Sequence, residues 1–148
     1  MSKVLIRKMT KEDIDQVLHV ERSSFAVPWD KDIYIKELTE NRYAYYSVVE
    51  ADGHVVGFCG LWVVIDEAQI TNIAILPALR GKKYGSALFQ YVLNQAVALG
   101  AARLSLEVRQ SNLVAQKLYS KYGLVPGGIR KNYYTDNNED ALVMWVNL

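Results

Sequence analysis

Residues Gln69–Ser86 read QITNIAILPALRGKKYGS, and the order of elements in the rest of the chain can be worked out from them. The stretch opens as an extended run and ends at Pro77; its β-branched residues, of the kind strands favour, are Ile70, Thr71, Ile73 and Ile75. A loop of glycines and lysines follows at 80–85, and apolar residues at helical spacing begin at Tyr84. The stretch therefore predicts a strand, a loop and a helix in direct succession.

This strand–loop–helix unit can hold a phosphate group, because the first N–H groups of a helix have no partners within the helix. Two common phosphate-binding motifs are excluded. The dinucleotide fingerprint G-x-G-x-x-G requires more glycines than Gly81 and Gly85, and a P-loop requires a lysine where Ser86 follows Gly85. The alternative to a phosphate site is an ordinary connection with solvated lysines.

Length and composition indicate a globular protein with one domain, residues 1–148. Hydrophobic residues make up 51% of the chain and charged residues 22%, which is typical of a soluble domain. The net charge of +1 favours neither a nucleic-acid nor a membrane partner. The longest apolar run, near 61–65, is too short to span a bilayer, and the N-terminus lacks the apolar core of a signal peptide. We therefore expect a cytosolic protein.

The residue types that carry covalent or metal chemistry give no signal. Cys59 is the only cysteine, which excludes an internal disulfide, and its apolar strand favours a buried thiol over a nucleophile. His19 and His54 have no cysteine or carboxylate cluster near them in the sequence. We expect no metal site.

The first half of the chain predicts two helices between strands. A strand over 4–9 leads into Thr10–Asp13, which resembles a capping box. The next helix carries an apolar stripe, and Asp30 can cap a second, short helix. The stripe comprises Ile14, Val17, Leu18 and Phe25. Asp52-Gly53 then predicts a two-residue hairpin turn between strands over 45–51 and 54–65.

The second half predicts a mixed sheet. The helix over 84–99 is expected to bury Tyr84, Leu88, Tyr91, Val92, Ala96 and Leu99. A strand over 103–109, a helix capped by Asn112 and two strands over 124–134 and 140–146 follow. A strand–helix–strand crossover requires a parallel pair, whereas the hairpins require antiparallel pairs. We expect an α/β (α+β) fold, a mostly antiparallel sheet with a central parallel pair and helices on both faces.

Arg80-Gly81-Lys82-Lys83-Tyr84-Gly85 resembles the acetyl-CoA pyrophosphate loop of the GNAT superfamily of N-acetyltransferases, Q/R-x-x-G-x-G/A. It fits that pattern at Arg80 and Gly85 and departs at Lys83, where the family has glycine. If that position needs a positive φ, Lys83 carries strain of about 1–2 kcal/mol. The whole order of elements also resembles the GNAT fold.

Matches between residues 21 and 144 resemble one branch of that superfamily, the RimI-type alanine N-acetyltransferases of bacterial ribosomal proteins. They include 106–112 (LEVRQSN), 122–124 (YGL) and 130–134 (RKNYY). The resemblance implies transfer of acetyl from acetyl-CoA to the N-terminal alanine of a small-subunit ribosomal protein by direct attack in a ternary complex. The alternatives are a lysine or small-molecule amine as acceptor, or a non-catalytic acyl-CoA-binding module. We expect a monomer or a weak dimer.

The resemblance also implies how the carrier is bound. The backbone of Ile73, Ala74 and Ile75 would hold the pantetheine and the acetyl carbonyl, with an N–H near Ile75 as oxyanion donor. Asn112 would form a hydrogen bond to the carrier. The pyrophosphate would lie on the loop residues Arg80, Gly81, Lys82, Lys83, Tyr84, Gly85 and Ser86.

Glu107 is the general base that the resemblance implies, acting through water. Alternation along the strand places the Glu107 side chain on the opposite face of the strand from the apolar residues Leu104, Leu106 and Val108. The alternative is an ion pair with Arg109 on the same face. An α-amine with a pKa of ~8 is roughly a tenth neutral at pH 7, whereas a lysine costs ~3 kcal/mol more to deprotonate. A single carboxylate therefore suits an N-terminal amine.

Tyr119 is the general acid that the resemblance implies. Proton transfer from a phenol of pKa ~10 to a thiolate of pKa ~8.5 is uphill by ~2 kcal/mol, so hydrogen bonding is at least as important as full transfer. The alternative is a core tyrosine, and both can hold if the ring is buried and the hydroxyl faces the site.

Aromatic residues from two segments are expected to bind the acceptor. Tyr133 and Tyr134 lie in the last hairpin, and Phe25 and Trp29 lie in the loop between the first two helices. A slot with aromatic walls would admit a small first residue such as alanine. The alternatives are simple packing of the hairpin, or RNA stacking by 130–134, which one basic patch at this net charge supports weakly.

Overall fold

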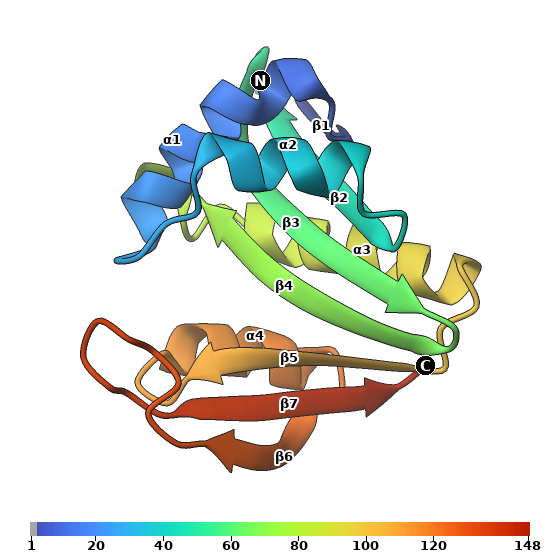
Figure 1. Cartoon of the computed structure of the whole chain (residues 1–148), viewed down its shortest axis with the longest axis vertical. Helices are drawn as coiled ribbons and strands as arrows, with labels where there is room; N and C mark the ends of the chain where they lie inside the picture. The colour runs from blue at the N-terminus through green and yellow to red at the C-terminus, as the bar shows by residue number, and fades with distance from the viewer. Residues whose placement is uncertain (1–2) are drawn as a thin grey trace.

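The computed structural model describes residues 3–148, which form a seven-stranded sheet covered by four α-helices (Figure 1). The helices are α1 (Ile14–Ser24), α2 (Lys31–Thr39), α3 (Tyr84–Ala98) and α4 (Leu113–Lys121). The strands are β1 (Val4–Lys8), β2 (Ala44–Ala51), β3 (His54–Val64), β4 (Glu67–Ile75), β5 (Arg103–Arg109), β6 (Val125–Arg130) and β7 (Ala141–Asn147). Short 3-10 turns lie at Lys11–Asp13 and Pro77–Leu79.

The strand order β1-β2-β3-β4-β5-β7-β6 confirms the expected mixed sheet, with β4 and β5 as its parallel pair. The two strands pair only from Glu67–Gln69 to Arg103–Ser105, and beyond that point they separate (Figure 1). The β3–β4 register shifts at the same level: Asn72 lies opposite Gly60 and Ile70 opposite Leu61, which leaves Thr71 as an extra residue in a β-bulge. The sheet is therefore split at its centre.

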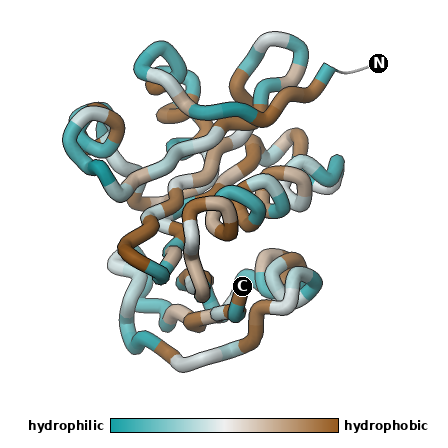
Figure 2. Tube along the Cα trace, turned by 90° about the vertical axis from the view of Figure 1, so that its right-hand side faces the viewer, coloured by the Kyte–Doolittle hydropathy of each residue, from teal (hydrophilic) through white to brown (hydrophobic). Residues whose placement is uncertain are grey.

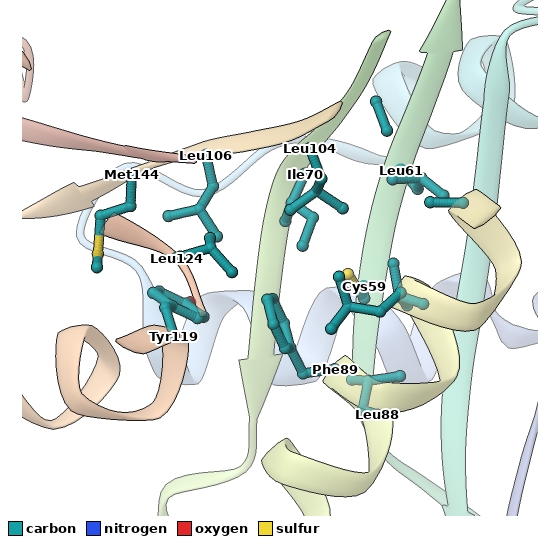
Figure 3. Packing of buried hydrophobic residues seen from close by; sticks show 14 of the residues in the cluster. Cys59, Leu61, Ile70, Leu88, Phe89, Leu104, Leu106, Tyr119, Leu124 and Met144 are labelled. Atoms are coloured by element: carbon teal, nitrogen blue, oxygen red, sulfur yellow. The ribbon is translucent and has the colours of Figure 1, made fainter. Parts of the chain in front are cut away.

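Helices cover both faces of the sheet, as expected, and each face has its own core. On one face α1 and α2 pack on β2–β4, around Tyr34 and Phe58. On the other, α3 and α4 enclose a larger core, whose members include Cys59, Leu61 and Leu88 (Figure 3). Hydrophobic positions run through the middle of the molecule, and hydrophilic ones gather in the outer loops and helix turns (Figure 2). No helix within residues 3–148 is both long enough and apolar enough to cross a membrane.

Local signals placed the turns and caps correctly. Ala51 pairs with His54 across the Asp52-Gly53 turn, and both turn residues have positive φ, 51° and 84°, as a type I′ hairpin requires. The Asp30 and Asn112 side chains accept the N–H groups of Ile33 and Ala115 at 3.0 and 3.1 Å. These side-chain contacts fix where α2 and α4 begin.

Three details of the prediction were wrong. Phe25 lies beyond the end of α1, in extended backbone with φ −120° and ψ 138°. On α3, Phe89 and Leu93 are buried, whereas Tyr91 and Leu99 are 36% and 37% exposed. Tyr91 lies about 130° round the helix from the centre of the buried stripe, and Leu99 follows the last turn.

The third error concerns the strand predicted over 124–134. β6 ends at Arg130, and Asn132 has a φ of 53°, which no strand can continue through. Tyr133 and Tyr134 therefore lie in the loop between β6 and β7.

The loop before α3 has the backbone that its sequence suggested. Lys83 is the N-cap of α3 and has φ 68° and ψ 11°, in the left-handed region. A side chain in this region costs about 1–2 kcal/mol, which glycine avoids.

We predict that Lys83→Gly stabilises the free protein by about 1 kcal/mol, because glycine adopts the left-handed conformation without strain. Urea unfolding of the variant and the wild-type protein measures this difference. Lys82→Gly is the matched control, because the neighbouring residue does not have a positive φ, and this change should be neutral or destabilising. Equal loss of stability in both variants would show that Lys83 is not strained.

Candidate active site

A cavity of about 510 Å³ lies where β4 and β5 separate. Residues 70–73 of β4 and 106–109 of β5 form two of its walls. The α1–α2 loop and the loop between β6 and β7 close it from either side. The split in the sheet thus creates an opening that is lined by both polar and apolar side chains.

The structure brings eight of the predicted site residues to this cavity: Phe25, Trp29, Ile73, Glu107, Asn112, Tyr119, Tyr133 and Tyr134. The other predicted carrier residues do not line it. Ala74 and Ile75 are buried at the end of β4, and Arg80–Ser86 lie beyond that strand. The functional roles of both groups remain predictions.

Glu107 is held in place by side chains from two other segments. Its carboxylate accepts a hydrogen bond from Gln69 Nε2 at 3.3 Å and forms an ion pair with Arg130 Nε at 3.4 Å. The Glu107 side chain is only 11% exposed. The carboxylate is therefore fixed at the cavity wall with one exposed cation beside it.

The alternative interpretation of the sequence, an ion pair between Glu107 and Arg109, is wrong. Arg109 instead binds Asp136 at 2.9 Å and Glu139 at 3.2 Å, and its guanidinium lies 4.0 Å from the centre of the Tyr134 ring. The acidic loop between β6 and β7 draws Arg109 away, which leaves Glu107 free of it.

Tyr119 lies in the core, as one of the two interpretations of the sequence expected. Its ring packs 5.1 Å from that of Phe89, and the residue is 6% exposed (Figure 3). It also lines the cavity. Burial raises the pKa of the Tyr119 phenol, so the hydroxyl keeps its proton and is suited to donate a hydrogen bond.

A clamp of charged groups holds the loop that carries Tyr133 and Tyr134. Glu139 accepts the Ser111 N–H at 2.7 Å and pairs with Arg109, while its carbonyl accepts the Tyr134 N–H at 3.1 Å. Hydrogen bonds from Ser111, followed by those from Arg109 and Asn137, lower the pKa of Glu139 to about 2. The loop is therefore tied to the end of β5 as long as Glu139 is ionised.

The N-terminus of α3 fits an anionic group. Its first helical hydrogen bond runs from the Ala87 N–H to the Lys83 carbonyl, so the preceding N–H groups are available, and its first turn contains no acidic residue. A Cβ at Gly85 would make only ordinary contacts, at 3.8 and 3.9 Å, so the fold does not require glycine there. The absence of a side chain leaves the backbone open to a ligand.

The rest of this loop is bound to the protein. Arg80 donates to the Ile75 carbonyl at 3.3 Å and to Ser24, a cavity residue, at 3.4 Å. The Ser86 hydroxyl lies 2.6 Å from that of Tyr122. Arg80 therefore links the loop to the edge of the cavity.

Sequence reasoning missed Glu21, a second carboxylate that lines the cavity. A signal was present, because Glu21 follows Val17 and Leu18 by one helical turn and so falls on the buried stripe of α1. Within residues 3–148, no group of three or more His, Cys, Asp or Glu side chains is placed to hold a metal ion.

Comparison with known proteins agrees with this architecture. Residues 14–124 match the acetyltransferase (GNAT) family, and the chain belongs to this family of acetyltransferases. Family membership implies acetyl-CoA as the co-substrate, and the gap between β4 and β5 together with the α3 N-terminus suits such a carrier.

Relatives match along nearly the whole chain. A Bacillus subtilis (strain 168) protein, provisionally named a [ribosomal protein bS18]-alanine N-acetyltransferase, is 56% identical over 147 residues, or 99% of this chain and 97% of that protein. The [ribosomal protein bS18]-alanine N-acetyltransferase of Escherichia coli (strain K12) is 34% identical and covers 94% of each chain. The crystal structure of the ribosomal-protein-S18-alanine N-acetyltransferase from Escherichia coli superposes with a TM-score of 0.90 at 31% identity, covering 98% of this chain and 94% of that chain.

We predict that the Glu139 clamp weakens in acid. A carboxyl whose pKa is lowered in the folded state stabilises the protein above its unfolded pKa, and this stabilisation is lost as the pH falls through the folded pKa. For Glu139 this pH window runs from the ordinary glutamate pKa of 4.5 down to the folded-state pKa of about 2. Glu139→Gln should therefore lower stability at pH 6, and its deficit relative to the wild-type protein should shrink through this window.

Urea unfolding at pH 6, 4.5 and 3 measures the deficit, with Glu40→Gln as the control at an exposed carboxylate. A deficit that is constant over this range would contradict the clamp.

Proposed function

We propose that this protein transfers acetyl from acetyl-CoA to the N-terminal α-amine of alanine in ribosomal protein bS18. The observation that carries the chemistry is the meeting of Glu107 and Tyr119 at one cavity, where the parallel strands separate. The choice of acceptor is supported by relatives that share 56% and 34% identity with the chain over almost its full length and carry this substrate in their names. We further propose that residues 1–148 act as one domain in the cytosol.

The carrier supplies the acetyl group in an activated form, as a thioester. The backbone edge of Ile73–Ile75 that does not pair with β5 would hold its pantetheine arm, and Asn112 would bind it from the start of α4. Arg80–Ser86 would hold the pyrophosphate through the first N–H groups of α3. Lys82 and Lys83 add positive charge there.

Glu107 would take the proton from the α-ammonium group, through water, so that the amine can attack. Gln69 orients the carboxylate, and Arg130 is exposed enough for an incoming ammonium group to replace it. Tyr119 would donate a hydrogen bond to the departing thiolate. Because burial raises the pKa of this phenol, hydrogen bonding is favoured over full proton transfer.

The other side chains fit direct transfer of the acetyl group from the carrier to the amine, without an acetyl-enzyme intermediate. Cys59 is fully buried, and burial raises the pKa of its thiol, so the sulfur is unsuited to form an acetyl-enzyme. Phe25 and Trp29 on one side and Tyr133 and Tyr134 on the other would enclose the first residue of the peptide. Alanine fits between such walls better than a bulky residue does.

We predict that Glu107→Gln lowers kcat by about 100-fold or more, because the base is lost, while affinity for acetyl-CoA stays the same. Steady-state kinetics and calorimetry measure the two quantities. Glu12→Gln is the control, because Glu12 is an exposed carboxylate that is distant from Glu107 in the sequence. This substitution should change neither kcat nor the affinity for acetyl-CoA. Normal carrier binding with full turnover would show that Glu107 is not the base.

We predict that a peptide with the N-terminal sequence of bS18 gains one acetyl group on its α-amine. The same peptide, blocked at the N-terminus and containing lysine, should remain unmodified, because a lysine is about 3 kcal/mol harder to deprotonate. Mass spectrometry of both peptides, and of intact ribosomal proteins after incubation with acetyl-CoA, reads the outcome. Faster modification of the blocked peptide would identify a lysine acetyltransferase instead.

A further inference from the structure

Glu21 is a buried carboxylate to which the proposed reaction assigns no role. It lies on α1, is 1% exposed and forms no ion pair among residues 3–148. Three donors surround it instead: the Trp29 N–H, the Tyr34 hydroxyl and Asn72 Nδ2, the last at 3.1 Å. A buried charge without a cation is costly, so its presence at the cavity wall calls for an explanation.

The three donors come from three different segments. Trp29 ends the loop from Phe25 that forms one wall of the cavity, Tyr34 belongs to α2, and Asn72 belongs to the β-bulge of β4. Asn72 Nδ2 also donates to the Tyr34 hydroxyl at 3.0 Å. One carboxylate therefore connects the peptide side of the cavity to the strand on which the carrier would lie.

The bulge is packed from its other side as well. A side chain at Gly60 would collide with Thr71, Tyr46 and Asn72, so the glycine lets these three groups pack onto β3. Thr71 also donates to Asn72 Oδ1 at 3.0 Å, which turns the amide nitrogen of Asn72 toward Glu21. Asn72 is thus a fixed point against which Glu21 can hold a loop.

We propose that Glu21 is a positioning residue, which holds the Phe25–Trp29 loop against the β4 bulge and so sets the slot for the first residue of the peptide. The inference rests on the proposed function. The Trp29 N–H and Asn72 Nδ2 can only donate, and the Tyr34 hydroxyl accepts from Asn72 and donates to Glu21, so all three contacts favour the ionised carboxylate. Hydrogen bonds to an ionised acceptor are stronger than those to a neutral one, so this carboxylate holds the Trp29 backbone in place. Glu21 is poorly placed to act as the base, because both of its oxygens already accept hydrogen bonds from the protein.

Glu21→Gln separates positioning from simple packing. Glutamine fills the same volume but places an NH₂ group against donors, so the loop should loosen and KM for an Ala-starting peptide should rise about tenfold. KM for acetyl-CoA should stay within twofold of the wild-type value. The melting temperature should not fall, because the substitution also removes a buried charge whose desolvation raises the pKa of the carboxyl.

Two further variants complete the experiment. Tyr34→Phe removes one of the three donors and should raise the peptide KM in the same direction by a smaller factor. Glu37→Gln is the matched control, because Glu37 is a hydrogen-bonded carboxylate on α2 that does not line the cavity, and it should leave the peptide KM unchanged.

The proposal is overturned if Glu21→Gln leaves the peptide KM unchanged. It is also overturned if the variant fails to fold, or if both KM values rise while the melting temperature falls, since Glu21 would then serve stability alone. Failure of the proposed function is a separate result: the wild-type protein would not acetylate the Ala-starting peptide at all.

Discussion

The parting of β4 from β5 is the constraint on which the rest of the structure depends. The two strands pair over only three residues each, Glu67–Gln69 with Arg103–Ser105, and then separate while helices continue to cover both faces of the sheet. Beyond Gln69, the β5-facing edge of β4 has no strand to accept its backbone hydrogen bonds. Buried backbone groups need partners, and the proposed function assigns this edge to a ligand that supplies them.

The same split determines which side chains of β5 lie in the core and which line the cavity. Leu104, Leu106 and Val108 point into the core beneath α3 and α4, and strict alternation turns Glu107 toward the gap. Two residues along, Arg109 meets the acidic loop between β6 and β7 and anchors it. One strand thus positions the proposed base and also holds the loop that carries the aromatic wall. On the opposite side of the cavity, Glu21 holds the α1–α2 loop by accepting the Trp29 N–H, as Arg109 holds the loop between β6 and β7.

Local patterns predicted most of the fold because they need only neighbours in sequence. The period of two over 103–109, the Asp52-Gly53 turn and the caps at Asp30 and Asn112 are all of this kind. The sequence left open whether residue 83 needs a positive φ, and the structure shows that Lys83 has one. The errors arose where tertiary contacts decide. Which face of α3 is buried depends on how the helix lies across β3. The ion-pair partner of Arg109 in the hairpin loop, Asp136, lies 27 residues away in the sequence. Glu21 was missed because its three donors are brought together only by the fold.

Amide hydrogen exchange followed by NMR, with and without acetyl-CoA, tests the central claim most directly. If the split between β4 and β5 holds the carrier, saturating acetyl-CoA should protect fast-exchanging amides within 70–75 and at 84–86. Amides at 67–69, where β4 and β5 already pair, should not change. Saturated binding that leaves 70–75 unprotected would contradict the account, because the carrier would then lie elsewhere on the molecule.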